Sequence, residues 1–219
     1  MVKAREWLWT WETLRQFCLG AGVLCGLGAA VWFGYTQFFT KGLERLPATL
    51  CDGTVERDMV TQVLPPARYA DEYSHGVDAG HQTRYSCSVA TSNDARVWST
   101  VEISSSTFED MLKNRPPNAR LIRASADGIE AYAASDKSTY VYVPCTPPVT
   151  DPSDDEYALV ARVDAWGDTA ITGAPLRQAL TDIGYRIAQH VYKLAECQDD
   201  RTWPDQLPPY DASEAPRER

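Results

Sequence analysis

The stretch FCLGAGVLCGLGAAVWFG, from Phe17 to Gly34, decides the architecture of this chain. It lies inside a longer segment, Gln16 to Thr40, that contains no charged residue. A helix over residues 17–39 would be about 34 Å long at about 1.5 Å per residue, and a bilayer's hydrocarbon core is about 30 Å thick. The sequence therefore predicts a transmembrane helix over residues 17–39.

Aromatic side chains bracket this segment, as expected where rings sit at the depth of the lipid headgroups. They are Trp7, Trp9 and Trp11 before it and Trp32, Phe33, Tyr35, Phe38 and Phe39 at its end. The alternatives are a buried core helix and a cleaved signal peptide. The apolar run exceeds the roughly 7–15 residues of a signal-peptide core, and no small-x-small cleavage site follows it. We therefore expect the helix to be retained as an anchor.

Basic residues flank the helix unevenly. Lys3, Arg5 and Arg15 precede it, whereas only Lys41 and Arg45 follow closely. Because cytoplasmic flanks carry the excess of Lys and Arg, this favours a cytoplasmic N-terminus over residues 1–16 and an exported C-terminal domain in the cell membrane.

Small residues recur every four positions along the helix. Such a stripe lets two helices approach closely, which would allow a homodimer to form within the bilayer. The alternative is coincidence, since glycine and alanine are common in membrane helices. The stripe comprises Cys18 and the predicted helix-packing residues Gly22, Gly26, Ala30 and Gly34.

The remainder of the chain is acidic. The 219 residues have a formal net charge of −9, and residues 41–219 carry 18 of the 21 basic and 28 of the 30 acidic groups. An acidic domain repels phosphate backbones, so we expect no nucleic acid partner. Solubility alone also accounts for this charge.

Four cysteines lie beyond the helix and predict two disulfides in an oxidising compartment. They are Cys51, Cys87, Cys145 and Cys197. Their wide spacing lacks the close pairs of a zinc site, so we expect no metal. Three pairings are possible. We favour Cys51 with Cys87 and Cys145 with Cys197, because each would tie a helix to a strand within one half of the domain.

Hydrophobic periodicity predicts strands and helices after a linker at residues 40–50. Helices are expected from an N-cap at Thr54 to Val63, from a capping box at Ser106 to Lys113, and from Pro175 to Cys197. A polar loop is expected through Gly80. Strands are expected over residues 82–90, 96–104, 129–134, 139–143 and 156–166.

These elements predict one exported α+β domain over residues 51–197. About five antiparallel strands would be covered on one face by helices, with a long C-terminal helix. The stripe expected to be buried on that helix is Leu176, Leu180, Ile183, Ile187, Val191 and Leu194. Residues 198–219 are polar and are expected to form a disordered tail.

This order of elements resembles a family of uncharacterised actinobacterial exported envelope proteins, some of which are near the Mog1/PsbP-like fold. The resemblance covers residues 46 to 197 and consists of a cysteine before a short helix, a cysteine-bearing strand, a hairpin, and a third cysteine before the final helix. The chain lacks the lipobox of the lipoprotein members. The resemblance implies a cell-envelope location and no reaction.

No motif for catalysis or cofactor binding is evident, so we expect neither catalytic residues nor a cofactor. His75 and His81 fall near several carboxylates, which could form a catalytic pair, but the composition is that of a solvated loop. His190 is expected to be a surface or partly buried residue of the last helix, beside its apolar stripe. Asp151, Asp154, Asp155 and Glu156 could hold calcium but lack the spacing of a calcium loop.

We therefore expect a non-enzymatic binding or interaction module of the cell envelope, anchored in the lipid bilayer. Its ligand would be an envelope protein, a cell-wall component or a small molecule. Tyr85, Trp98, Tyr140 and Tyr142 could line a binding face, although core packing is the more ordinary use of such residues. The alternative is an exported hydrolase that uses His75 or His81.

Overall fold

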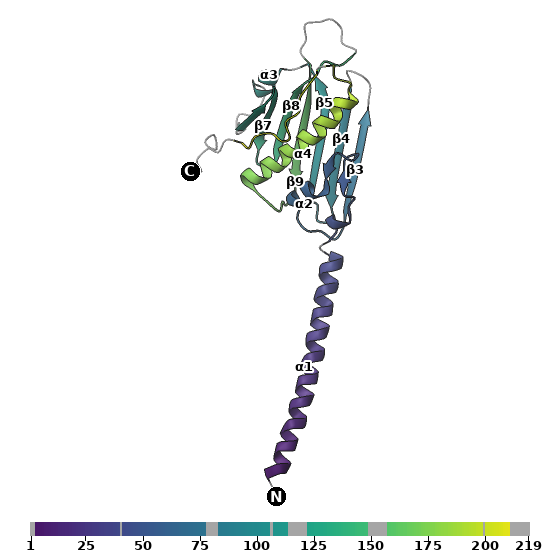
Figure 1. Cartoon of the computed structure of the whole chain (residues 1–219), viewed down its shortest axis with the longest axis vertical. Coiled ribbons are helices and arrows are strands. Elements are labelled where there is room, and N and C mark those ends of the chain that lie inside the picture. The colour runs from purple at the N-terminus through teal and green to yellow at the C-terminus, as the bar shows by residue number, and fades with distance from the viewer. Residues whose placement is uncertain are drawn as a thin grey trace.

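The structure is a computed structural model that describes residues 3–39, 41–77, 83–105, 107–113, 122–148, 157–198 and 200–210. It consists of one long helix followed directly by a sheet-based domain (Figure 1).

The long helix is α1, Lys3–Phe39. Its segment Leu14–Phe38 has 25 residues, none of them buried, and is long and apolar enough to cross a membrane. The small residues Gly22, Gly26 and Gly34 have open space beside them. Dimerisation through this stripe stays a prediction.

A seven-stranded antiparallel sheet forms the domain, with the strand order β3-β4-β5-β9-β8-β7-β6. The predicted α+β class with a long C-terminal helix is confirmed, but the sheet has seven strands where about five were expected. The strands are β3 (Ala70–Val77), β4 (Arg84–Thr91), β5 (Arg96–Ser104), β6 (Ile122–Ala126), β7 (Ile129–Ser135), β8 (Ser138–Pro144) and β9 (Ala158–Trp166).

One face of the sheet is covered by α4, Gly173–Leu194, which crosses β9 and β8 (Figure 1). The short helix α2, Arg57–Val63, packs against α4. Smaller elements complete the domain: η1 (Leu43–Arg45), the paired strands β1 (Thr49–Leu50) and β2 (Val55–Glu56), and α3 (Phe108–Lys113).

The core lies between α4 and the sheet. The predicted stripe is buried from Leu176 to Val191, but Leu194 is 39% exposed at the helix end, so that part of the prediction is wrong. At Gly184 the helix lies close against the sheet. A Cβ atom there would lie 3.0 Å from Cγ2 of Val163 and 3.4 Å from Cγ2 of Val141.

Two disulfides fasten the covering segments to the sheet. Cys51 is bonded to Cys87 of β4, and Cys145, which follows β8, is bonded to Cys197 beyond α4. This is the pairing favoured by the sequence. Closing loops of 36 and 52 residues reduces the conformational freedom of the unfolded chain.

The two strands missed by the sequence analysis are the sheet edges, β3 and β6. β3 was expected to be a polar loop. Its core-facing side carries Glu72, Ser74 and Gly76, which pair with Val89, Cys87 and Tyr85 of β4. Because the inward side of β3 carries no large apolar residue, no apolar alternation marks it as a core strand.

Two helix starts differ from the expected positions. α2 begins at Arg57 rather than after Thr54, because Val55 and Glu56 pair with β1. α3 begins after Thr107, whose Oγ1 accepts a hydrogen bond from the amide of Asp110 at 3.2 Å, so the cap lies one residue later than predicted.

The prediction of a disordered tail is wrong for residues 200–210, which pack against α4. Leu207 is fully buried, Trp203 contacts Tyr185 and Tyr192, and the Tyr185 hydroxyl donates to the carbonyl of Pro204 at 2.6 Å. Residues 211–219 lie outside the described part. α4 thus packs against residues of the tail, such as Trp203 and Leu207, that the polar composition of this segment did not mark as part of a core.

Replacing Gly184 with Leu should destabilise the domain by about 1–3 kcal/mol, because the added atoms have no space between α4 and the sheet. Chemical denaturation of the whole chain in detergent, followed by near-ultraviolet circular dichroism, would measure this loss. Lys193→Leu, on the exposed side of the same helix, is the control and should change little. Equal stability of the two variants would contradict the packing described here.

Candidate ligand-binding face

The face of the sheet opposite α4 is partly open and carries aromatic and charged side chains. Strand alternation places these residues there, because their neighbours in sequence point toward α4. We call the following set the aromatic face: Tyr73 of β3, Trp98 of β5, Tyr140 of β8, and Arg162 and Asp164 of β9.

Strand register brings four members of this set into adjacent positions. Trp98 pairs with Asp164 across β5 and β9, and Arg162 pairs with Tyr140 across β9 and β8. Tyr140 in turn pairs with Tyr132 of β7. Side chains directly opposite on one face lie about 5 Å apart, so they form a continuous array across four strands.

Two kinds of ring contact hold Tyr140 in place. Its ring stacks on that of Tyr132 with a centroid distance of 4.7 Å and an interplanar angle of 2°. On its other side, the guanidinium carbon of Arg162 lies 5.6 Å from the ring centroid, within the range of a cation–π contact. Tyr140 is therefore fixed in orientation while remaining partly exposed.

Arg162 and Asp164 form an ion pair beside this stack. Nη2 of Arg162 donates to Oδ1 of Asp164 at 3.2 Å, and its Nε lies 2.7 Å from Oδ2. The Asp164 side chain is 7% exposed and that of Arg162 is 45% exposed. The face therefore presents a cation whose counter-charge is buried beneath it.

The charge state of the array follows from its surroundings. Burial, with a further contribution from Tyr140, raises the pKa of Tyr132 to about 12, so this phenol stays neutral at physiological pH. Burial disfavours the charge of Arg162, but the hydrogen bond to Asp164 and the neighbouring charges outweigh it and raise the pKa of the guanidinium. The array thus places the uncharged ring of Tyr132 and the stacked ring of Tyr140 beside the Arg162–Asp164 ion pair.

The open face is hollowed at both ends. A cleft of about 480 Å³ lies at the start of β5, bordered by Trp98, Trp166 and Arg96. A second hollow of about 710 Å³ lies at the other end, beside Phe108, Tyr142 and others. There α3 covers the sheet, since the Phe108 ring lies 5.6 Å from the ring of Tyr142 and 5.9 Å from that of Tyr132.

The structure divides the four aromatic residues singled out from the sequence. Trp98, 36% exposed, and Tyr140 lie on the open face, whereas Tyr142 is 7% exposed beneath α3 and Tyr85 is 1% exposed on the α4 side. Tyr85 is thus a core residue. Arg162, Asp164 and Trp166 were missed, although the alternation of β9 could have placed them opposite its apolar positions.

In the described residues, His75 pairs across the strands with Ser86, but neither its ring nor that of His190 is hydrogen-bonded to a nucleophilic side chain. His75 is exposed on the edge strand β3, and Ser86 Oγ donates to its backbone carbonyl rather than its ring. His190 is half-buried on α4, its ring 5.7 Å from that of Tyr85 in an edge-to-face contact. His81 lies outside the described residues.

A polar cluster surrounds the Cys51–Cys87 disulfide on the α4 side. The Cys51 amide donates to Glu72 Oε1 at 2.6 Å, while Ser74 and Tyr85 each donate to the Asp52 carboxylate at 3.0 Å. Burial, followed by the bond to Asp52, raises the pKa of Tyr85 well above its ordinary value. These bonds hold Cys51 and Asp52 at positive φ values of 55° and 58°.

This cluster also contains a set of potential metal donors, one atom each from Cys51, Glu72 and Cys87, within 4.8 Å of one another. The two sulfur atoms are bonded to each other, so neither is a free thiolate ligand. The acidic group from Asp151 to Glu156 considered for calcium lies outside the described residues. We assign no metal to either place.

Comparison with family models, with curated proteins and with solved structures finds no match to this chain. The resemblance to actinobacterial envelope proteins therefore stays a prediction. A role for the aromatic face rests on the chemistry of its own side chains.

Replacing Arg162 with Ala should destabilise the domain by about 1–3 kcal/mol, because the buried Asp164 carboxylate loses its counter-charge. Adding Asp164→Asn should restore part of this loss, since the amide carries no charge. Denaturation curves of the single and double variants would measure both effects. Arg96→Ala, an exposed arginine on the same face, is the control; a loss as large as that of Arg162→Ala would contradict the pairing.

Proposed function

We propose that this chain is a single-pass membrane protein whose C-terminal domain is a binding module of the cell envelope, outside the membrane. We further propose that its ligand rests on the aromatic face. The ligand would be a protein segment, a cell-wall component or a small molecule. The observation that carries the proposal is the exposed Trp98 beside the ordered array of Tyr140, Arg162 and Asp164.

Retention of α1 as an anchor is supported by how it meets the domain. Nη2 of Arg45 donates to the carbonyl of Gln37 in the last turn of α1 at 2.7 Å, and its Nη1 donates to the carbonyl of Arg68 at 3.4 Å. The carbonyls of a last helical turn have no partner within the helix, and a guanidinium satisfies them well. The helix end is thus bonded to the folded domain.

The compartment and orientation are supported by two further features. Two disulfides fit an oxidising environment outside the cytoplasm. The basic residues Lys3, Arg5 and Arg15 favour a cytoplasmic N-terminus. Both features favour the same direction of insertion, with the domain exported.

Binding on the aromatic face is supported by its mixture of groups. An exposed indole buries a large apolar area at little conformational cost, so Trp is enriched where proteins bind partners. The adjacent guanidinium offers hydrogen-bond donors held in a fixed plane. The face therefore suits a ligand that packs an apolar surface on the indole of Trp98 and accepts hydrogen bonds from the guanidinium of Arg162. A sugar ring and a peptide chain each combine an apolar surface with hydrogen-bond acceptors.

Topology can be tested with cysteines introduced one at a time at Ala4 and at Asp127, in a chain whose Cys18 and Cys25 are replaced by Ala. In intact cells stripped of their wall, a membrane-impermeant maleimide should label position 127, and it should label position 4 only after lysis. Peptide mapping by mass spectrometry gives the measurement. The reverse pattern would show that the domain is cytoplasmic.

Ligand binding can be tested by placing a photoreactive benzophenone amino acid at Trp98 and, as a control, at Lys193 on the exposed side of α4. Irradiation of intact cells should yield a discrete cross-linked adduct from position 98 and none from position 193, because only the first lies on the aromatic face. Arg162→Ala should reduce the yield at position 98. Equal yields at both positions, or no adduct at position 98, would contradict the proposed face.

A further inference from the structure

The lower end of the domain is fixed close to the end of the proposed membrane span. The amide of Gly42 donates to the carbonyl of Ala67 at 2.7 Å, and a Cβ atom at Gly42 would lie 2.6 Å from Cα of Tyr69. Residue 42 is only four positions beyond Phe38, the last residue of the candidate span. The backbone of Tyr69 therefore lies at the level where the span ends, against the segment that leaves α1.

The membrane-facing edge of the sheet extends from Tyr69 through the β4–β5 turn to the end of β9. The amide of Ser92 in the β4–β5 turn donates to the carbonyl of Tyr69 at 3.0 Å, and Arg96, which follows this turn, pairs with Trp166. Three strand spacings of about 4.8 Å place Trp166 about 14 Å from β3 along this edge. Figure 1 shows α1 entering the domain at this end, with the strands running roughly along its axis.

Exposed aromatic rings gather at this end. In the described residues beyond α1, the exposed large hydrophobic side chains are Tyr69 (55%), Tyr73 (64%), Trp98 (36%), Trp166 (57%) and Leu194 (39%). Tyr69 and Trp166 mark the two ends of the edge just described. We call these two residues the membrane-proximal rim.

The chemistry of the rim fits the headgroup layer of a bilayer. Trp and Tyr are enriched there because their rings are amphipathic, and this layer is several ångströms thick on each side. The charges beside the rim are mixed: exposed Arg96 and Lys137 accompany exposed Asp94 and Asp168. A near-balanced edge gives little attraction to anionic lipid, so the aromatic rings are the groups that would bind the membrane.

We propose that the membrane-proximal rim docks on the headgroup layer of the bilayer crossed by α1, with the rings of Tyr69 and Trp166 inserted. This docking rests on the membrane anchoring proposed above. It adds two contacts that fix the tilt of the domain relative to the bilayer, beyond the junction that Arg45 makes between α1 and the domain. The strands would then stand upright on the membrane. The aromatic face would be perpendicular to the bilayer surface, and a ligand would approach it from the side.

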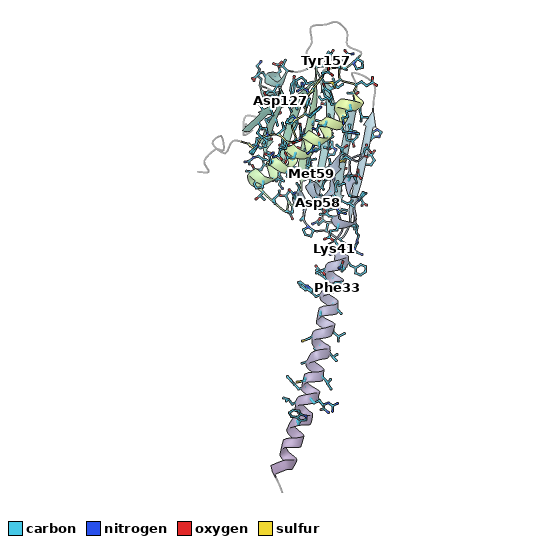
Figure 2. All side chains as sticks on the ribbon, viewed as in Figure 1. Phe33, Lys41, Asp58, Met59, Asp127 and Tyr157 are labelled. Atoms are coloured by element: carbon cyan, nitrogen blue, oxygen red, sulfur yellow. A yellow bond between two sulfur atoms is a disulfide. The ribbon has the colours of Figure 1, made fainter. Side chains whose placement is uncertain are left out.

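The test uses the full chain in phosphatidylcholine liposomes, with a nitroxide spin label at one cysteine at a time. The labelled positions are Asp168→Cys beside the rim, Asp127→Cys at the far end of the domain (Figure 2), and native Cys25 in the middle of α1. Other unpaired cysteines are replaced by Ala. Collision rates with oxygen and with a water-soluble nickel chelate give the depth of each label.

We expect the label at 168 to collide with the nickel chelate several-fold less often than the label at 127. Tyr69→Ser together with Trp166→Ser should abolish this protection. Tyr73→Ser together with Trp98→Ser, an exposed Tyr–Trp pair higher on the domain, is the matched control and should preserve it. Because the rings carry no charge, added phosphatidylglycerol should leave the protection unchanged.

Each contrary outcome has its own meaning. Equal nickel accessibility at positions 168 and 127, with Cys25 shielded, would overturn the docking and leave the anchoring intact. Water exposure of Cys25 would overturn the anchoring and the docking with it. Protection that persists in the Tyr69 and Trp166 double variant, or that appears only with phosphatidylglycerol, would overturn the role assigned to the two rings.

Discussion

The packing of α4 on β9 is the constraint on which the rest of the domain depends. β9 is the central strand of the sheet, with three strands on each side. Its inward residues Leu159, Ala161 and Val163 are fully buried beneath the helix. Because strand side chains alternate, the same packing turns Arg162 and Asp164 to the opposite face. The candidate site is thus a consequence of how the core is formed.

The covering layer is held by covalent and polar ties at both ends of the sheet. One disulfide joins the Cys51 loop to β4, and the other joins the end of β8 to the chain beyond α4. The first is reinforced by hydrogen bonds from Ser74 and Tyr85 to Asp52. These ties explain how a polar edge strand such as β3 stays in the sheet, since its inward side chains bind the loop that the disulfide anchors.

The site and the anchor are connected through the lower edge of the sheet. Arg45 binds carbonyls of both α1 and the segment before β3, so the membrane helix and the sheet share one junction. The cleft beside Trp98 and Trp166 lies at this same end. Under the proposed topology, a ligand of the aromatic face would be met close to the bilayer surface rather than far above it.

The sequence by itself determined the features that depend on local pattern. The apolar run of α1, the even number of cysteines after it, the five inner strands β4, β5, β7, β8 and β9, and most of the buried stripe of α4 each follow from composition or periodicity. Trp98 and Tyr140 were also recognised as candidates for a binding face. These features require no knowledge of distant neighbours.

Tertiary structure alone decided what depends on contacts between distant segments. β3 carries no apolar alternation because its inward neighbours are polar groups of the Cys51 loop, and residues 200–210 are ordered because α4 offers a surface for Trp203 and Leu207. The alternation within β9 could be found in the sequence, but it did not show that β5 and β8 would lie beside this strand. That strand order made Arg162 and Asp164 neighbours of Tyr140 and Trp98, and the same packing sent Tyr85 into the core because α4 covers only one face of the sheet.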